Sequence, residues 1–218
     1  MPLFLPIQST QNVYHFSDTD KNISLLDISE TFGTYDGSFV LYDNNLDSWK
    51  IYDLEEATKR IPPESTYKIY DALLGLESGI ITPEHSSMTW NGDAFPFPSW
   101  EADQDLNSAM QNSVNWYFQA IDSQLGINRV QEFLNKIEYG NQTTSSNLDL
   151  YWSDFSLKIS PLEQVTLLKK FNTNEFHLNF QNVFSVKNAI KIASTPNGNF
   201  YGKTGTGRVN GQDINGWF

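Results

Sequence analysis

The sequence contains no cysteine and only three histidines, and both shortages exclude kinds of chemistry. Without thiols the chain has no disulfide, no cysteine nucleophile and no zinc–thiolate site. His15, His85 and His177 lie far apart and form neither an HExxH nor an HxH pattern. Because metal sites need clustered ligands, we expect no metal ion.

The chain also lacks a long apolar run and a basic cluster. No stretch approaches the roughly 18 to 20 apolar residues of a membrane span. Residues 1–7 carry no basic group and are broken by prolines, so we do not expect a signal peptide there. Lys and Arg number 14 against 26 Asp and Glu, which gives a formal net charge of −12. Because affinity for phosphates comes from clustered basic residues, we expect no nucleic-acid partner.

The elements that the sequence predicts change in kind along the chain. Two apolar, β-rich runs flank an Asn/Asp/Ser cluster at residues 44–48, which predicts a hairpin. Ser160, Pro161 and Glu163 form a capping box that starts a helix. We predict helices over residues 65–78, 105–110, 115–125, 128–137, 161–171 and 186–193, and late strands over 200–202 and 214–218.

Strands, then helices, then strands predict an α+β fold. With 39% hydrophobic residues, the 218-residue chain has enough apolar side chains for a core. We expect a single domain over residues 1–218, with an antiparallel sheet lobe at about 34–64 and 182–218. A helical lobe is inserted between these segments, over about 65–181.

Ser65 and Lys68 raise a question of chemistry. At positions i and i+3 they share a face at the start of a helix whose other residues are largely apolar. A serine hydroxyl needs a base to become a nucleophile, and burial makes a lysine amine neutral enough to serve. The alternative is a helix cap beside a lysine that reaches out to solvent.

Two further segments favour the chemical interpretation. Ser113-Val114-Asn115 lies between two predicted helices, and Lys203-Thr204-Gly205 follows a predicted strand. Glycines at 205 and 207 would let a ligand approach an edge strand closely. Ser-x-x-Lys, a Ser-x-Asn-like element and Lys-Thr-Gly, in this order, are the signature set of penicillin-recognising serine proteins.

With these motifs, nearly the whole chain resembles the penicillin-recognising domain of the class D β-lactamase superfamily. Within it, the sequence is most similar to the extracellular sensor domain of the β-lactam sensor-transducers, the BlaR/MecR family. Further landmarks are Phe97-Pro98-Ser99-Trp100, Ser113-Val114-Asn115-Trp116-Tyr117, Tyr139-Gly140-Asn141, Tyr151-Trp152, Leu157-Lys158-Ile159-Ser160 and Gly216-Trp217-Phe218. The resemblance implies a β-lactamase/transpeptidase-like fold and β-lactam antibiotics as partners.

The resemblance also implies roles for particular residues. Ser65 would attack the lactam carbonyl, and Lys68, carboxylated by carbon dioxide, would be the general base, with Trp152 hydrogen-bonded to the carbamate. Apart from carbon dioxide or bicarbonate, no cofactor is implied. The other implied groups are Ser113 as proton relay, Lys203 as the cation beside it, Thr204, Gly205, Thr206, Val114 and Asn115 at the substrate, and the backbone N–H groups of Ser65 and Thr206 as oxyanion hole.

Some landmarks have plainer alternatives. Trp100, Trp116, Trp152 and Trp217 are also what a core of aromatic residues would contain. Tyr139-Gly140-Asn141 is also what the C-terminal cap of a helix would contain.

Asn115 separates a sensor from a hydrolase. Hydrolytic class D enzymes have an apolar residue at this position. An amide here would hydrogen-bond the uncarboxylated Lys68 amine, so the base for hydrolysis would be missing and the acyl group would stay on Ser65. The alternative is that Asn115 only caps its helix. We therefore predict a sensor that keeps the acyl group, with a class D β-lactamase as one alternative and a catalytically silent binding domain as another.

The resemblance bears on the parent protein as well. The family's domain continues past Gly216-Trp217-Phe218, so we expect this chain to be a fragment whose last strands and closing helix are truncated. As part of a transducer it would be tethered at the extracellular face of a bacterial membrane. As an enzyme it would be secreted.

Overall fold

The computed structural model describes residues 22–218, which form two compact units that divide between residues 59 and 60. In the first unit β2 (Phe39–Asp43) and β3 (Ser48–Tyr52) form the predicted antiparallel hairpin. The Asp43 carboxylate accepts hydrogen bonds from two backbone N–H groups of the turn, which stabilises it. The strand β1 (Ile23–Leu25) pairs with β3 in parallel. The unit also contains α1 (Ser29–Phe32) and α2 (Leu54–Thr58).

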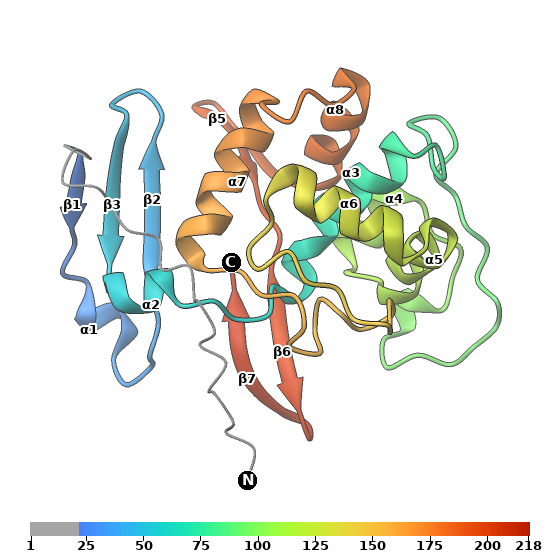
Figure 1. The fold of residues 1–218 in the computed structure, drawn as a ribbon, viewed down its shortest axis with the longest axis horizontal. Helices are drawn as coiled ribbons and strands as arrows, with labels where there is room; N and C mark the ends of the chain where they lie inside the picture. Colours follow the sequence, from blue (N-terminus) through green and yellow to red (C-terminus); the bar gives the residue numbers. More distant parts are fainter. Residues whose placement is uncertain (1–21) are drawn as a thin grey trace, which may run out of the picture. The chain divides into compact units, whose positions relative to one another are not determined.

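The second unit contains the other helices and two hairpins (Figure 1). Its elements are η1 (Glu64–Tyr67), α3 (Lys68–Glu77), η2 (Pro98–Trp100), α4 (Leu106–Gln111), α5 (Asn115–Leu125), α6 (Ile127–Ile137), α7 (Pro161–Thr173), α8 (Phe180–Ala189), β4 (Lys191–Thr195), β5 (Gly198–Tyr201), β6 (Gly205–Val209) and β7 (Gln212–Trp217). In this unit β4 pairs with β5 and β6 with β7, both antiparallel.

Capping residues account for most of the correct helix predictions. Asp105 accepts a hydrogen bond from the Ser108 backbone and caps α4, and Ser160 with Glu163 forms the predicted capping box of α7. The first predicted helix begins with a 3₁₀ turn at Glu64, one residue early. The bounds of α5 are those predicted, and α6 begins one residue before its predicted start.

The prediction of a helix over residues 186–193 is wrong. The helix α8 begins at Phe180, where the Asn179 side chain caps it, and ends at Ala189. Residues 191–195 form β4, because the Pro196-Asn197-Gly198 turn folds them back onto β5 in a hairpin. A short apolar run fits a helix end and a strand equally well, and cross-strand pairing decides between them.

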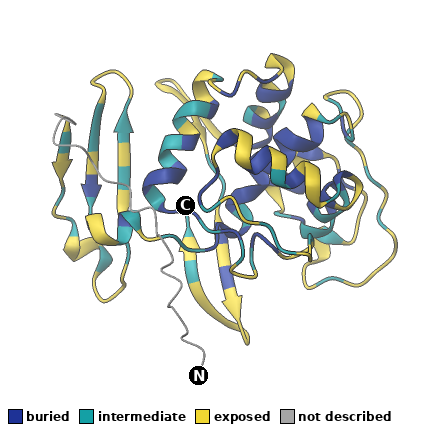
Figure 2. Cartoon of the chain, in the orientation of Figure 1, coloured by how far each residue is buried: buried dark blue, intermediate teal, exposed yellow. Residues whose placement is uncertain are grey.

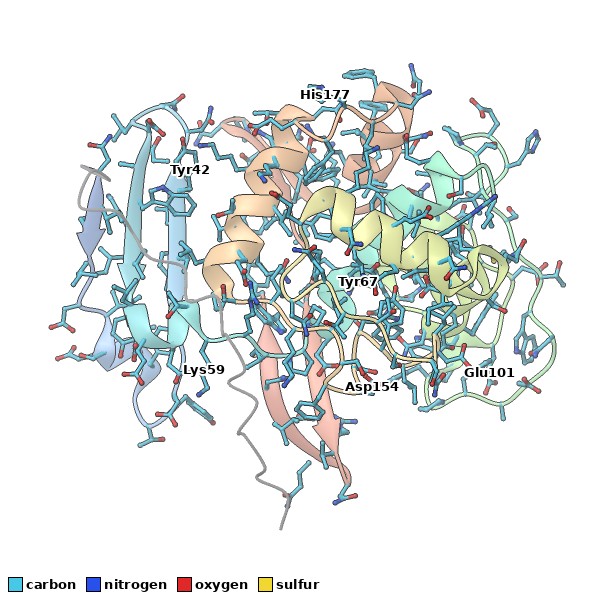
Figure 3. The ribbon with its side chains drawn as sticks, viewed as in Figure 1. Tyr42, Lys59, Tyr67, Glu101, Asp154 and His177 are labelled. Carbon is cyan, nitrogen blue, oxygen red and sulfur yellow. The ribbon has the colours of Figure 1, made fainter. Side chains whose placement is uncertain are left out.

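The core of the second unit is built around α3. Every residue from Lys68 to Leu76 is buried, and this helix packs against α5 and α8. Figure 2 shows the buried positions concentrated on these helices, whereas β4 and β5 are exposed. Tyr67 lies within this core (Figure 3), edge to face with Tyr139 and Tyr151.

The α+β class predicted from the sequence is confirmed, with strands in small sheets rather than in one continuous sheet. Whether the chain forms a single domain stays a prediction. Over residues 22–218 no helix is both long and apolar enough to cross a membrane. Of the three histidines, His15 lies outside the described residues.

Candidate active site

The turn that carries Ser65 is held in place from two sides. The backbone N–H of Glu64 donates to the carbonyl of Trp152 at 3.0 Å, and the indole N–H of Trp217 donates to the carbonyl of Pro62 at 2.8 Å. Glu64 has a φ of +53°, a conformation that non-glycine residues adopt only when the surroundings impose it. The chain therefore enters the 3₁₀ turn in a fixed orientation, with Ser65 in its middle.

Lys68 does not reach solvent, so the interpretation as a snorkelling lysine is wrong. Its side chain is 1% exposed, and its amine donates to Ser65 Oγ and to Asn115 Oδ1, both at 2.8 Å. The Trp152 ring centre is 4.3 Å from the amine. Burial, with the nearby positive charge of Lys203, lowers the pKa of Lys68 to about 7. At neutral pH a large share of this amine is therefore uncharged and able to take a proton.

Asn115 does not cap its helix. The N-cap position of α5 belongs to Val114, and no side chain caps it. The Asn115 side chain instead accepts the hydrogen bond from Lys68, so the amide lies against the amine as the sensor interpretation requires. Val114 is fully buried and belongs to the core.

Ser113 and Lys203 form a second serine–lysine pair. Ser113 follows α4 with a φ of +56°, and its hydroxyl accepts a hydrogen bond from Lys203 Nζ at 2.9 Å. The same amine donates to the carbonyl of Thr204, also at 2.9 Å. Burial lowers the pKa of Lys203 to about 8, so this amine is mostly a cation at neutral pH. The structure thus brings two hydroxyl–amine pairs into one unit.

Gly205 of β6 lies against the turn that carries Ser65. A Cβ atom at Gly205 would lie 3.0 Å from the Pro63 carbonyl oxygen and 3.3 Å from the Ser65 backbone nitrogen. The glycine therefore lets β6 approach this turn closely, and the approach of a ligand at these glycines stays a prediction. Thr204 and Thr206, on alternate positions, are exposed.

The indole N–H groups of three tryptophans near the site differ in their partners: two donate to backbone carbonyls, and one has no acceptor among the described residues. Trp116 donates to the carbonyl of Trp100, and Trp100 donates to the carbonyl of Asn112, the residue before Ser113, both at 2.9 Å. Trp152 is different, because its indole nitrogen is buried and has no hydrogen-bond partner among the described residues. A buried N–H group without an acceptor is costly, so an acceptor that binds beside Lys68 would be stabilised here.

Of Tyr139-Gly140-Asn141, only Tyr139 takes part in the cap of α6: Glu138 is left-handed, and the Tyr139 backbone N–H donates to the Leu134 carbonyl at 3.0 Å. Gly140 has a φ of +50° and touches the Lys158 carbonyl so closely that a Cβ would clash. Asn141 donates to the Ser156 carbonyl and accepts from the Lys158 backbone N–H, at 2.7 and 2.9 Å. The motif therefore fixes the segment that leads into α7.

Sequence reasoning missed Glu64. Its carboxyl group is buried beside Asn215, with which it shares a hydrogen bond, and burial raises its pKa to about 7. In the sequence, Glu64 stands out only because it follows Pro62-Pro63 and precedes Ser65. This position alone does not distinguish it from a surface glutamate.

The pKa values of the two lysines predict a narrow pH optimum for acylation. In the roles that the resemblance implies, Lys68 accepts a proton and Lys203 acts as a cation. The rate should therefore rise as Lys68 loses its proton near pH 7 and fall as Lys203 loses its own near pH 8. Stopped-flow measurement of benzylpenicillin acylation from about pH 6 to 9 checks this. A flat profile across that range would contradict both roles.

Comparison with known proteins agrees with this geometry. Residues 35–218 match the penicillin binding protein transpeptidase domain, and the chain belongs to that family. It is 46% identical over 199 residues to the regulatory protein BlaR1 of Bacillus licheniformis, covering 90% of this chain and 33% of that protein. It is 35% identical over 197 residues to the probable β-lactamase YbxI of Bacillus subtilis, covering 90% of this chain and 73% of that one.

Among solved structures, the chain is likewise similar both to a penicillin-receptor domain and to class D β-lactamases. The C-terminal domain of the Bacillus licheniformis BlaR penicillin-receptor superposes with a TM-score of 0.83 at 46% identity, covering 87% of this chain and 78% of that one. A class D β-lactamase from Bacillus subtilis gives 0.80 at 35% identity, covering 83% and 76%. These likenesses confirm the predicted fold. The chain spans about a third of the length of the BlaR1 proteins it matches.

Proposed function

We propose that this chain is a β-lactam sensor domain, which is acylated on Ser65 and keeps the acyl group. The observation that carries the proposal is the 2.8 Å hydrogen bond from the Lys68 amine to the Asn115 amide oxygen. It adds to the likeness to BlaR1 proteins, of which one solved relative is described as a penicillin-receptor.

Acylation follows from the two serine–lysine pairs. Lys68 takes the proton of Ser65 as the hydroxyl oxygen attacks the lactam carbonyl carbon. Backbone N–H groups of Ser65 and Thr206 stabilise the oxyanion, a contribution typically worth about 3 to 4 kcal/mol for one donor. The C–N bond of the ring breaks, and Ser113, hydrogen-bonded to Lys203, passes a proton to the departing nitrogen. The drug's carboxylate binds Thr204 and Thr206.

The surroundings of Lys68 fit a carboxylated amine. Carbon dioxide bound to this amine would supply a carbamate oxygen as the general base, and the unpaired Trp152 indole N–H is the group that would hold it. The amine itself is buried and has a pKa of about 7, so its uncharged form, which reacts with carbon dioxide, is available.

The acyl group is retained because Asn115 holds the uncarboxylated amine of Lys68. Asn115 accepts a hydrogen bond from Lys68, and a net hydrogen-bond energy of about 1 kcal/mol shifts a balance between two states by roughly fivefold. Without a restored carbamate, Lys68 does not supply the base that would activate water for hydrolysis. The adduct then persists as the signal, in a parent protein tethered at the outer face of a bacterial membrane.

A class D β-lactamase is the second candidate. It is favoured by the likeness to YbxI and to class D structures, and it uses the same acyl-serine intermediate. The two functions differ only in how fast the acyl group leaves.

Replacing Asn115 with valine tests the proposal. The variant loses the acceptor that holds the bare Lys68 amine, so added bicarbonate should accelerate release of the acyl group by about fivefold or more, whereas the wild type should barely respond. Adduct lifetime is measured by intact mass spectrometry with and without bicarbonate. Gln119→Val is the matched control, since this α5 amide donates to the distant Asp149 carbonyl.

An Asn115→Val protein whose adduct is as long-lived in bicarbonate as the wild type's would show that the amide does not strand the acyl group. Rapid hydrolysis by the wild type would favour the enzyme instead.

A further inference from the structure

Two buried carboxyl groups lie in the same core as Lys68, and neither has a part in the proposed acylation of Ser65. Asp71 and Asp122 are both fully buried. Asp71 follows Lys68 by three positions on α3, so the two side chains project from the same face of the helix. Asp122 comes from α5, the helix that packs against α3 and also carries Asn115.

The hydrogen bonds of the two carboxyl groups indicate a shared proton. Neither oxygen of Asp71 accepts a hydrogen bond from an amide, amine or hydroxyl group of the described residues. Asp71 interacts with Asp122, one oxygen of which also has no partner among the described residues, while its other oxygen accepts a hydrogen bond from the Tyr151 hydroxyl at 3.3 Å. Two adjacent carboxylates in a dry core cannot both be ionised, and one proton between them gives the missing hydrogen bond.

The pair is linked to Lys68 along two routes. One is the single helical turn between Lys68 and Asp71, over which each group acts electrostatically on the other. The other is the chain itself, because Tyr151, which bonds Asp122, precedes Trp152, whose ring lies against the Lys68 amine.

We propose that Asp71 and Asp122 act as a proton-holding pair that follows the charge of Lys68. When Lys68 is an ammonium group, the pair keeps one proton and one negative charge. When Lys68 becomes carboxylated, the pair takes up a second proton. The residues touch neither substrate nor reacting atoms, so they are positioning residues that act through the lysine.

The step balances. An ammonium Lys68 first loses one proton to solvent. Carboxylation of the uncharged amine then forms a bond between the Lys68 nitrogen and the carbon of carbon dioxide, and it releases a second proton from that nitrogen. The pair, with one negative charge, accepts that proton, so the buried region holds one negative charge, now on the carbamate. Loss of carbon dioxide reverses the transfer, and the negative pair then stabilises a cationic Lys68. This part of the inference rests on the proposed carboxylation.

The electrostatic surroundings support the exchange at neutral pH. Burial raises the pKa of both carboxyl groups above the usual range, so the pair retains a proton at neutral pH. The other groups that interact with the pair are Asp149, whose negative charge raises the Asp122 pKa, and three tyrosines. Burial raises the pKa of each tyrosine, so all three stay neutral; they are Tyr67, Tyr117 and Tyr151.

The test compares the wild type with the isosteric double variant Asp71→Asn/Asp122→Asn, whose pair is permanently neutral. The carbamate carbon is followed by NMR with ¹³C-labelled bicarbonate, and the affinity for dissolved carbon dioxide is measured against pH. The measurement is made below pH 7, where Lys68, with its pKa of about 7, is an ammonium group. There the logarithm of the affinity should rise with pH with a slope of about two if both released protons go to solvent, and of about one if the pair takes up one of them. We expect the flatter slope in the wild type and the steeper one in the double variant.

A second readout does not need carbon dioxide. Loss of the negative charge should lower the pKa of Lys68, by about one unit or more, which corresponds to at least about a tenfold change in its proton affinity. It is measured by NMR on ¹³C-labelled lysine. Tyr70→Phe, which removes a buried hydroxyl without a partner among the described residues from the position before Asp71, is the matched control and should behave as the wild type.

Equal slopes and an unchanged Lys68 pKa in the double variant would overturn the pair's role. Absence of a carbamate in every protein would instead defeat the proposed carboxylation, and the lysine titration would still decide whether the pair sets the charge of Lys68. Should the double variant not fold, the wild-type slope alone decides, since a value of about two excludes proton uptake.

Discussion

Ser65→Ala is expected to abolish the covalent adduct with benzylpenicillin completely. The Ser65 hydroxyl is the one that the Lys68 amine contacts, at 2.8 Å, in a turn fixed by hydrogen bonds from Glu64 and Trp217. Alanine removes the nucleophilic oxygen and leaves the turn intact. Intact mass spectrometry after brief exposure to the drug should show the added mass on the wild type and none on the variant.

Ser78→Ala provides the matched control for this loss. This serine lies at the other end of α3, at its C-terminal cap, and its loss should leave adduct formation unchanged. An Ser65→Ala protein that still gains the drug's mass would show that another residue is the nucleophile.

Lys68→Ala is expected to slow acylation by about 10²- to 10⁴-fold, the usual contribution of a general base. The geometry places the buried Lys68 amine on Ser65, and its pKa of about 7 lets it lose its proton and take up carbon dioxide to form the base. The rate constant of acylation is measured by following the slow gain of adduct mass over time. Because the hydroxyl remains, the final extent of labelling should match the wild type.

The control is Lys187→Ala, which removes a lysine from α8 that contacts Asn172 and not the site. It should acylate at the wild-type rate. If Lys68→Ala did so as well, the general base would have to be sought elsewhere.

The helices could be predicted where the local sequence determines them. Asp105 and the pair Ser160 and Glu163 cap α4 and α7 through contacts within four residues, and the structure has these caps. Residues 191–193 could not be assigned from local pattern, because their strand depends on pairing with residues 198–201. A helix and a strand compete equally for such a short run until a partner strand is present.

In the candidate site, too, the sequence predicted some residues, and the rest depend on contacts between distant segments. Motif order pointed to Ser65, Lys68, Ser113 and Lys203, and the structure brings them together as two hydrogen-bonded pairs. Their catalytic roles stay predictions.

The proton-holding pair had no signal in the sequence, since an aspartate in a helix normally faces water. Only the packing of α3 against α5 buries Asp71 and Asp122 together. Glu64 was missed for a related reason, because its burial depends on β6 and on Asn215, far along the chain.

The lifetime of the acyl adduct on the unmodified chain tests the central claim most directly. After brief exposure to benzylpenicillin and removal of free drug, intact mass spectrometry follows the acylated fraction, and nitrocefin turnover is measured in parallel. We predict one adduct on each chain that persists for a time comparable to a bacterial generation, with no sustained turnover. Fast, multiple-turnover hydrolysis of nitrocefin with no lasting adduct would contradict the sensor function and identify a class D β-lactamase.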